Sequence, residues 1–192
     1  MRRLVYYVAV SLDGCIAAAD GDYSAFLAEG DHMRSVLGDF TDALPGPALE
    51  ALGLVADRSR FDTVVMGWNT YAVGLPAGLT DPYPHLRTVV FSRGRTARDV
   101  PAPVTLSTDD PVSVVRALKA EPAGSDIWLC GGGQLAGALH DEIDALVLKV
   151  NPITVGDGIG LFGGRAATGS YALTQSTAFD SGVVISHYDR VR

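Results

Sequence analysis

Residues 126–140 read DIWLCGGGQLAGALH, and this stretch decides the fold. The apolar run 127–130 is typical of a buried strand, and residues 134–140 favour a helix. Glycines between a strand and a helix N-terminus let backbone amides approach an anion, because no Cβ stands in the way. We therefore interpret Gly131, Gly132 and Gly133 as a phosphate-binding turn. A tight turn without a ligand is the alternative.

The same glycines fit the G-x-G-x-x-A pattern of Rossmann domains through Gly131, Gly133 and Ala136. A Rossmann domain expects an acidic residue at the end of the next strand. Here the next apolar run ends in Lys149, Val150 and Asn151. The sequence therefore disfavours an ordinary Rossmann domain.

On both sides of this stretch, strand-like runs alternate with helix-like segments. Strands are predicted at 4–10, 63–66, 88–91, 127–130 and 145–150, and helices within 25–44 and at 47–58, 111–120 and 134–140. This alternation is typical of an α/β fold with a mostly parallel central sheet. Residues 171–176 and 183–189 predict a C-terminal antiparallel hairpin that turns at 179–182. The length predicts a single domain, residues 1–192.

A second glycine turn follows the predicted strand 63–66 and contains Gly67, Trp68, Asn69 and Thr70. By itself it indicates helix capping by Asn69 or Thr70 without a ligand. Together with the triple glycine, however, it predicts two helix N-termini that hold one diphosphate from both sides.

Ser92 and Arg93 follow the predicted strand 88–91. Ligands gather at the carboxyl ends of strands in α/β sheets, and the guanidinium fork matches a phosphate. These two residues are therefore candidates for binding a phosphate monoester. The alternative is a solvated loop.

Asp13 and Gly14 follow the first predicted strand and are first of all a turn signal. Asp13 is also the candidate catalytic residue, because a carboxyl group there could supply a proton directly or through water.

Four motifs occur in the order of the dihydrofolate-reductase-like superfamily: SLDGCIA (11–17), MGWNTY (66–71), VVFSR (89–93) and GGG (131–133). Residues 151–162, NPITVGDGIGLF, resemble the Pro-x-x-x-Gly-x-Gly segment of one branch. The chain is most similar to that branch, the reductase C-terminal domain of bacterial riboflavin biosynthesis and its stand-alone relatives.

This resemblance implies a three-layer fold with helices on both faces of the sheet, NADPH across the carboxyl ends of the strands, and a homodimer. The diphosphate is expected between the two glycine turns, the adenosine phosphate near Ser92, and nicotinamide beside Ala9. The implied cofactor-binding residues are Ala9, Ile16, Gly67, Trp68, Asn69, Thr70, Ser92, Arg93, Gly131, Gly132, Gly133, Gln134 and Leu135.

Two departures from the family pattern stand out. Trp68 replaces an arginine that commonly follows Met-Gly and helps to hold the cofactor phosphate. Residues 23–47 match no family substrate-binding pattern, and they offer four candidate acids: Glu29, Asp31, Asp39 and Asp42. The substrate is therefore left open.

Composition excludes several other classes of function. A net charge of −7 and a pI near 4.9 disfavour nucleic acid and anionic membranes as partners. Residues 1–10 predict neither a signal peptide nor a membrane span, and Cys15 and Cys130 are expected as free thiols in the cytoplasm. The four histidines have no metal-site spacing, so no metal is predicted.

The sequence thus predicts an NADPH-dependent reductase that transfers a hydride to a small heterocyclic or ribosylaminopyrimidine-type substrate. A pteridine or dihydrofolate-type reductase is one alternative. The other is a non-catalytic protein that binds a nucleotide or small molecule on the same fold.

Overall fold

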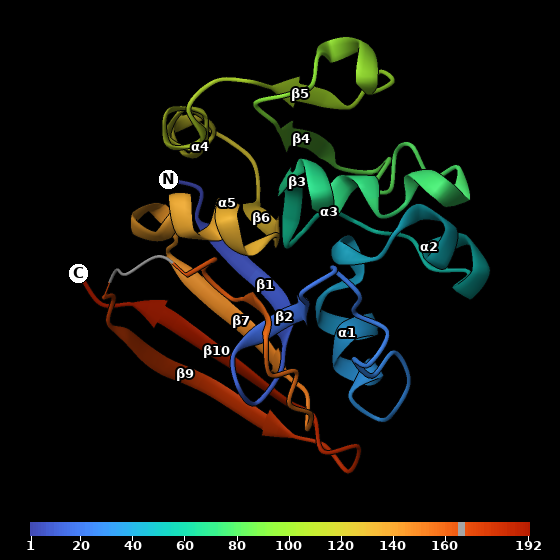
Figure 1. Cartoon of the computed structure of the whole chain (residues 1–192), viewed down its shortest axis with the longest axis vertical. Helices are drawn as coiled ribbons and strands as arrows, with labels where there is room; N and C mark the ends of the chain where they lie inside the picture. Colours follow the sequence, from blue (N-terminus) through green and yellow to red (C-terminus); the bar gives the residue numbers. More distant parts are fainter. Residues whose placement is uncertain (165–167) are drawn as a thin grey trace.

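One eight-stranded sheet forms the centre of the computed structural model, which describes residues 1–164 and 168–192 (Figure 1). Its strand order is β5-β4-β3-β6-β1-β7-β10-β9, and all pairings from β5 to β7 are parallel. The strands are β1 (Leu4–Val10), β3 (Phe61–Gly67), β4 (Arg87–Phe91), β5 (Thr105–Ser107), β6 (Asp126–Gly131), β7 (Ala145–Val150), β9 (Tyr171–Ala178) and β10 (Val184–Arg190). The mostly parallel α/β sheet predicted from the sequence is confirmed.

Helices cover both faces of this sheet, as the three-layer prediction requires. The α-helices are α1 (Met33–Asp39), α2 (Gly46–Leu52), α3 (Trp68–Ala72), α4 (Pro111–Ala120) and α5 (Gly133–Ala138). One apolar core contains Phe40 and Tyr71 beside α1 and α3, and the other contains Val115 and Leu135 from α4 and α5. In Figure 1, α4 and α5 accordingly lie on one side of the sheet and α1 to α3 on the other. No helix of the described residues is long and apolar enough to cross a membrane.

The C-terminal hairpin forms as predicted, with β9 and β10 antiparallel around the turn at 179–182. A carboxylate fixes this turn against the start of α1, because Asp31 accepts hydrogen bonds from the amides of Asp180 and Ser181 at 2.8 and 3.0 Å. Since β10 also pairs with β7, the hairpin extends the parallel sheet by two antiparallel strands.

The sequence analysis did not predict three short strands: β5, β2 (Cys15–Ala18) and β8 (Gly158–Gly160). Strands β2 and β8 form a separate two-stranded sheet. Residues 15–18 and 158–160 pair over a long sequence separation, which local pattern does not reveal. The helix predicted at 47–58 ends at Leu52, because Gly53 adopts the left-handed conformation (φ 62°) that closes a helix. Within 25–44, only residues 33–39 form an α-helix.

Candidate functional site

The predicted cofactor residues come together at the carboxyl ends of the parallel strands. Gly67 ends β3 beside Phe91 of β4, and Met66 lies beside Gly131 of β6. Because these strands are parallel, the segments that follow them emerge at the same edge, in the order 92–93, 67–70, 131–135 and Ala9. With strands about 4.8 Å apart, this row spans roughly 14 Å across three strand spacings.

The glycine turns after β3 and β6 face each other. A Cβ added to Gly131 or Gly132 would stand 3.6 or 3.4 Å from the Thr70 hydroxyl oxygen, and one on Gly67 would stand 4.0 Å from the Gly132 amide nitrogen. The gap between the two strand ends is therefore lined by backbone and by Thr70. This lining fits a diphosphate, whose oxygens need amide and hydroxyl donors at close approach.

Two of the three consecutive glycines, Gly131 and Gly133, are required for different structural reasons. Gly131 has φ 145°, in the region that favours glycine, and its peptide bond to Gly132 is cis. Gly133 is fixed by packing, since a Cβ there would lie 2.2 Å from the Gly160 carbonyl oxygen. The glycine run thus keeps the gap beside Thr70 free of side chains and also allows close packing against the turn at 160–163.

The remaining predicted cofactor residues are less uniform in exposure. Leu135 is buried in the core, whereas Gln134 and Asn69 are exposed. Ile16 lies on the separate strand β2, and Ala9 is partly buried at the end of β1.

Two arginines, Arg93 and Arg95, follow β4, and one of them lies against Trp68. The Arg95 guanidinium carbon lies 4.6 Å from the centre of the Trp68 ring, a cation–π contact. Arg93 is exposed and makes no hydrogen bond or ion pair with any described residue. Two guanidinium groups are thus available at the β3–β4 end of the row.

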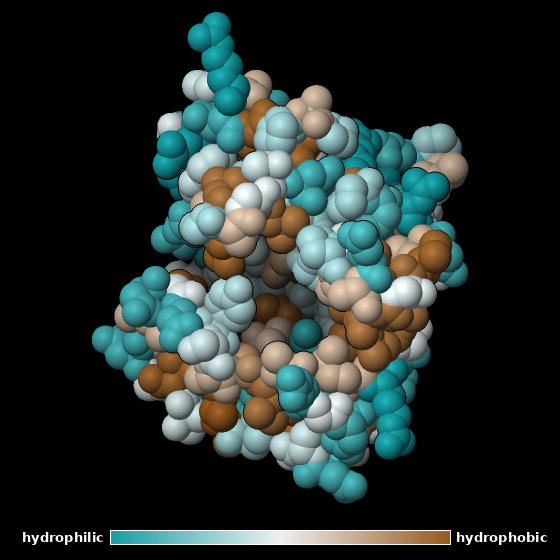
Figure 2. Space-filling model, turned by 90° about the vertical axis from the view of Figure 1, so that its right-hand side faces the viewer, coloured by the Kyte–Doolittle hydropathy of each residue, from teal (hydrophilic) through white to brown (hydrophobic). Residues whose placement is uncertain are grey.

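A cavity of about 450 Å³ lies beside the other end of the row. It opens along Val8 and Ala9 of β1, where nicotinamide is expected, and extends under the segment 23–45. Figure 2, a view from the side of α1 and α2, shows a hollow bordered by hydrophobic residues on this face. The volume falls within the roughly 300–1,000 Å³ of small-molecule sites.

Aromatic and aliphatic side chains form most of the cavity wall. Trp128 packs edge-on against Tyr83, and the Tyr83 hydroxyl lies 3.9 Å from the Cys130 sulfur. Burial raises the pKa of the Cys130 thiol to about 11, so it is neutral at physiological pH. The full lining is Tyr7, Val8, Ala9, Tyr23, Leu27, Ala28, His32, Met33, Val36, Ala43, Leu44, Pro45, Tyr83, Trp128, Cys130, Lys149, Asn151 and Val183.

Comparison with known families decides the relationship. Residues 2–185 match the family described as the RibD C-terminal domain. The chain belongs to the RibD C-terminal domain family. Two Bacillus subtilis (strain 168) proteins are similar to it: YwjB is 32% identical, covering 84% of this chain and 83% of its own, and YyaP is 26% identical, covering 95% and 92%.

Solved structures share the fold of this RibD C-terminal domain. A putative riboflavin biosynthesis protein from Shewanella sp. PV-4 is 27% identical, with a TM-score of 0.70 and full coverage of both chains. A Thermotoga maritima diaminohydroxyphosphoribosylaminopyrimidine deaminase/5-amino-6-(5-phosphoribosylamino)uracil reductase is 16% identical, with a TM-score of 0.62; the match covers 99% of this chain and 57% of that one. At that identity, the second likeness shows the fold alone.

In this RibD C-terminal domain, Asp13 anchors a loop. Its carboxylate accepts hydrogen bonds from the Ser11 hydroxyl at 2.5 Å and from the amides of Val155 and Gly156 at 3.1 and 2.7 Å. These donors lower the pKa of Asp13 to about 2, with the Ser11 bond the largest cause. The contacts join the end of β1 to the segment before β8. They do not test a catalytic role for Asp13, which stays a prediction.

None of the four candidate acids of the segment 23–47 lines the cavity. Asp31 caps the hairpin turn, and buried Asp42 accepts backbone hydrogen bonds from Arg58, Arg60 and Phe61 at 2.8 to 3.0 Å. Among the described residues, no group of three or more His, Cys, Asp or Glu side chains is arranged to hold a metal ion.

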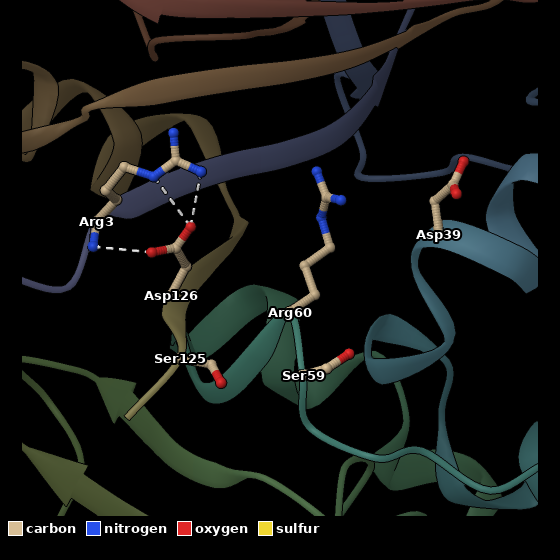
Figure 3. Close-up of a pocket in the computed structure, with 6 residues that line it drawn as sticks. All are labelled: Arg3, Asp39, Ser59, Arg60, Ser125 and Asp126. Carbon is tan, nitrogen blue, oxygen red and sulfur yellow. Dashed lines mark hydrogen bonds and ion pairs between the residues drawn. The ribbon is translucent and has the colours of Figure 1, made fainter. Parts of the chain in front are cut away.

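A second hollow, of about 440 Å³, lies at the opposite end of the strands (Figure 3). Apart from Asp39 at the end of α1, it is lined by residues that precede or begin strands, such as Arg3 and Arg60, and so lies at the amino ends of the strands. Arg3 is paired with Asp126 at 2.9 Å, whereas the Arg60 guanidinium lies over the Phe40 ring at 4.1 Å. This hollow is polar and far along the strands from the glycine turns, so we assign the functional site to the other edge.

Sequence reasoning missed the cavity residues Lys149, Cys130 and Asn151. A signal was present, because Lys149 is a charged residue within an otherwise apolar strand. Asn151 ties the cavity wall to β7: its amide oxygen accepts a bond from the Leu27 amide at 3.0 Å, and its amide nitrogen donates to the Lys149 carbonyl at 2.9 Å.

We expect Asp13→Asn to lower the melting temperature at pH 7, because an amide replaces an ionised acceptor of three hydrogen-bond donors. The lowered pKa means that the stabilisation is present above about pH 3.8 and is lost as the pH falls toward about 2. The difference in melting temperature between wild type and variant should therefore shrink over that interval when measured by circular dichroism. Asp157→Asn, an exposed neighbour on the same segment, is the control. A difference that is constant from pH 7 to 2.5 would contradict this role.

Proposed function

We propose that this RibD C-terminal domain is an NADPH-dependent reductase of a small heterocyclic substrate. The observation that carries the proposal is the continuous row of Ser92–Arg93, the two glycine turns and Ala9, which ends at the apolar cavity. A dinucleotide along this row would bring its reactive ring beside a substrate in the cavity. Juxtaposition of two bound rings is the main requirement of hydride transfer.

The chain's own residues would supply positioning and exclusion of water. When bound, NADPH supplies the hydride. The Thr70 hydroxyl and the amides of the glycine turns would bind the diphosphate, and Ala9 and Ile16 would contact nicotinamide. The aromatic walls of the cavity would keep water from the reacting carbon. The Asp13 carboxylate is ionised at neutral pH, so in this proposal it orders the loop before Ile16 and its candidate catalytic role is proton supply to the substrate through water.

Selectivity for NADPH over NADH is assigned to Arg93 and Arg95. Trp68 stands where the resemblance to the family implies an arginine, and the Arg95 guanidinium lies over the Trp68 ring. A guanidinium binds a phosphate monoester through two parallel hydrogen bonds. The 2′-phosphate of NADPH is the group in the cofactor that this pair fits.

We expect Arg93→Ala and Arg95→Ala each to weaken NADPH binding by roughly tenfold or more, since a hydrogen bond to a charged group contributes about 1.5–3 kcal/mol. NADH binding should change by less than about threefold, because NADH lacks the 2′-phosphate. Emission of the reduced nicotinamide during titration measures both affinities. Arg98→Ala, an exposed arginine of the same loop, should leave both unchanged. Equal losses for the two cofactors would exclude this assignment.

The two other candidate functions differ from this one in a measurable way. A pteridine or dihydrofolate-type reductase would turn over different acceptors, and a non-catalytic binding protein would quench cofactor emission without oxidising NADPH. The described lining of the cavity contains no arginine, only Lys149 and His32 as basic side chains, and this favours keeping the pteridine-type substrate as a candidate.

We also propose that a second copy of the chain pairs with β9. This strand ends the sheet, carries no charged residue in YALTQSTA, and exposes all of its residues except Tyr171. Edge strands without charges or proline are templates for pairing with another chain. Leu173, 57% exposed, lies in the middle of this edge.

Leu173→Lys should convert the dimer into a monomer, since an exposed lysine on an edge strand opposes pairing. Sedimentation equilibrium across a range of protein concentrations measures this shift. Val191→Lys alters an equally exposed apolar residue, 55% exposed, outside β9 and should leave the dimer intact. A wild-type chain that sediments as a monomer at all concentrations would refute the pairing.

A further inference from the structure

The cavity contains a cation that no described side chain neutralises. Lys149 lies beside Ala9 in the β1–β7 pairing, so the two side chains point to the same face at the carboxyl edge of the sheet. Its amine makes neither an ion pair nor a hydrogen bond among the described residues and lies 4.7 Å from the centre of the Tyr7 ring. Burial lowers the pKa of the Lys149 amine, which shows that the surroundings disfavour its charge.

A second lysine of this chain has a different environment. Lys119 is buried, and its amine pairs with the Asp144 carboxylate at 2.5 Å and donates to the Glu142 carbonyl at 3.0 Å. Lys149 is half-buried in the cavity wall, and its amine has no such partner among the described residues. A lysine amine that lines a cavity without an internal partner is free to bind a ligand there.

The other polar groups of the cavity define what that ligand presents. The Tyr7 hydroxyl is buried and has no hydrogen-bond partner among the described residues. Both ends of the Asn151 amide are already used, by the Leu27 amide and the Lys149 carbonyl. The Cys130 thiol is neutral and lies 3.9 Å from the Tyr83 hydroxyl, and Nδ1 of His32 lies 3.1 Å from the Ser181 hydroxyl. The Lys149 amine and the Tyr7 hydroxyl are thus lining groups that can donate and have no partner among the described residues, and they fit a ligand that brings acceptor atoms.

The walls define its shape and charge. Tyr7, Tyr83 and Trp128 provide aromatic surfaces, which suit a flat ring. Among the described residues, no arginine lines the cavity and no α-helix of eight or more residues has its N-terminus in the lining, so the described lining lacks the features that usually bind a phosphate. One ammonium group instead matches a carbonyl, lactam or imide oxygen, including a weakly acidic one.

We propose that Lys149 is a specificity-determining residue that binds a ring oxygen of a planar, non-phosphorylated heterocyclic dione in this cavity. The proposal rests on the proposed function, because it names the substrate class of the same site. It selects a pteridine-type or simple pyrimidine dione over a ribosylaminopyrimidine phosphate. No covalent step is assigned to Lys149.

The two tryptophans allow the two sites to be read separately. Trp128 lines the cavity and Trp68 lies at the cofactor end, and the sequence has no others. In a Trp68→Phe background, fluorescence of Trp128 alone reports cavity binding. The probes are pteridine-2,4-dione and, as a phosphorylated pyrimidine dione, uridine 5′-monophosphate.

Pteridine-2,4-dione should quench Trp128 saturably and bind at least tenfold more tightly than uridine 5′-monophosphate. Lys149→Met should weaken its binding at least tenfold, and Lys149→Arg should retain part of it. Lys149→Met should also melt at the same or a higher temperature, because an unpaired charge is removed. Lys119→Met, which breaks an ion pair, should melt lower and keep the affinity of the folded protein for the dione.

Three outcomes would contradict the proposed role of Lys149. Unchanged dione affinity in Lys149→Met, tighter binding of uridine 5′-monophosphate, or no binding of either probe would overturn the proposal. A marked loss of stability in Lys149→Met would show a structural role instead. NADPH binding is followed separately through nicotinamide emission: Lys149-dependent dione binding without NADPH binding would leave the cavity ligand intact and remove the reductase function.

Discussion

Parallel pairing of β3, β6 and β1 is the constraint on which the functional edge of this protein depends. Parallel strands have their carboxyl ends on one side, so the segments that follow residues 10, 67 and 131 become neighbours although they are far apart in the sequence. The register then sets the fine placement: Met66 lies beside Gly131, and Gly67 therefore faces Gly132 across a gap with few side chains. A side chain in place of these glycines would occupy the space that the proposed diphosphate needs.

Because successive side chains of a strand point to opposite faces, the register also decides which side chains line the cavity. Alternate residues of β1 point to one face, and Tyr7 and Ala9 share that face with Trp128 of β6 and Lys149 of β7. Toward the middle of the sheet these positions form the apolar core under α1. At the carboxyl ends the same column of side chains continues into the cavity. The substrate pocket is thus an extension of the core in which α1 and its preceding loop leave space.

The cations at the two ends of the strands have different partners. At the amino ends, the buried side chain of Arg2 pairs with Asp62 and Glu121 and that of Lys119 with Asp144, whereas the half-buried Arg60 lies over the Phe40 ring. At the carboxyl ends, Arg93 and Lys149 have no ion-pair partner among the described residues. The carboxyl ends of parallel strands are where ligands gather in α/β sheets, so these two cations are available to a ligand.

The sequence by itself determined the fold class and the position of the glycine turns, because these depend on local signals. Apolar runs of strand length predicted β1, β6 and β7 within a residue at each end, glycines directly after the runs predicted the turns that follow β3 and β6, and the motif order indicated the family. The sequence did not reveal that Gly133 is required by Gly160, that Arg95 covers Trp68, or that Lys149 lies unpaired beside Ala9. Each of these relations joins residues from different elements, and only the register and packing of the folded chain decide which of them meet.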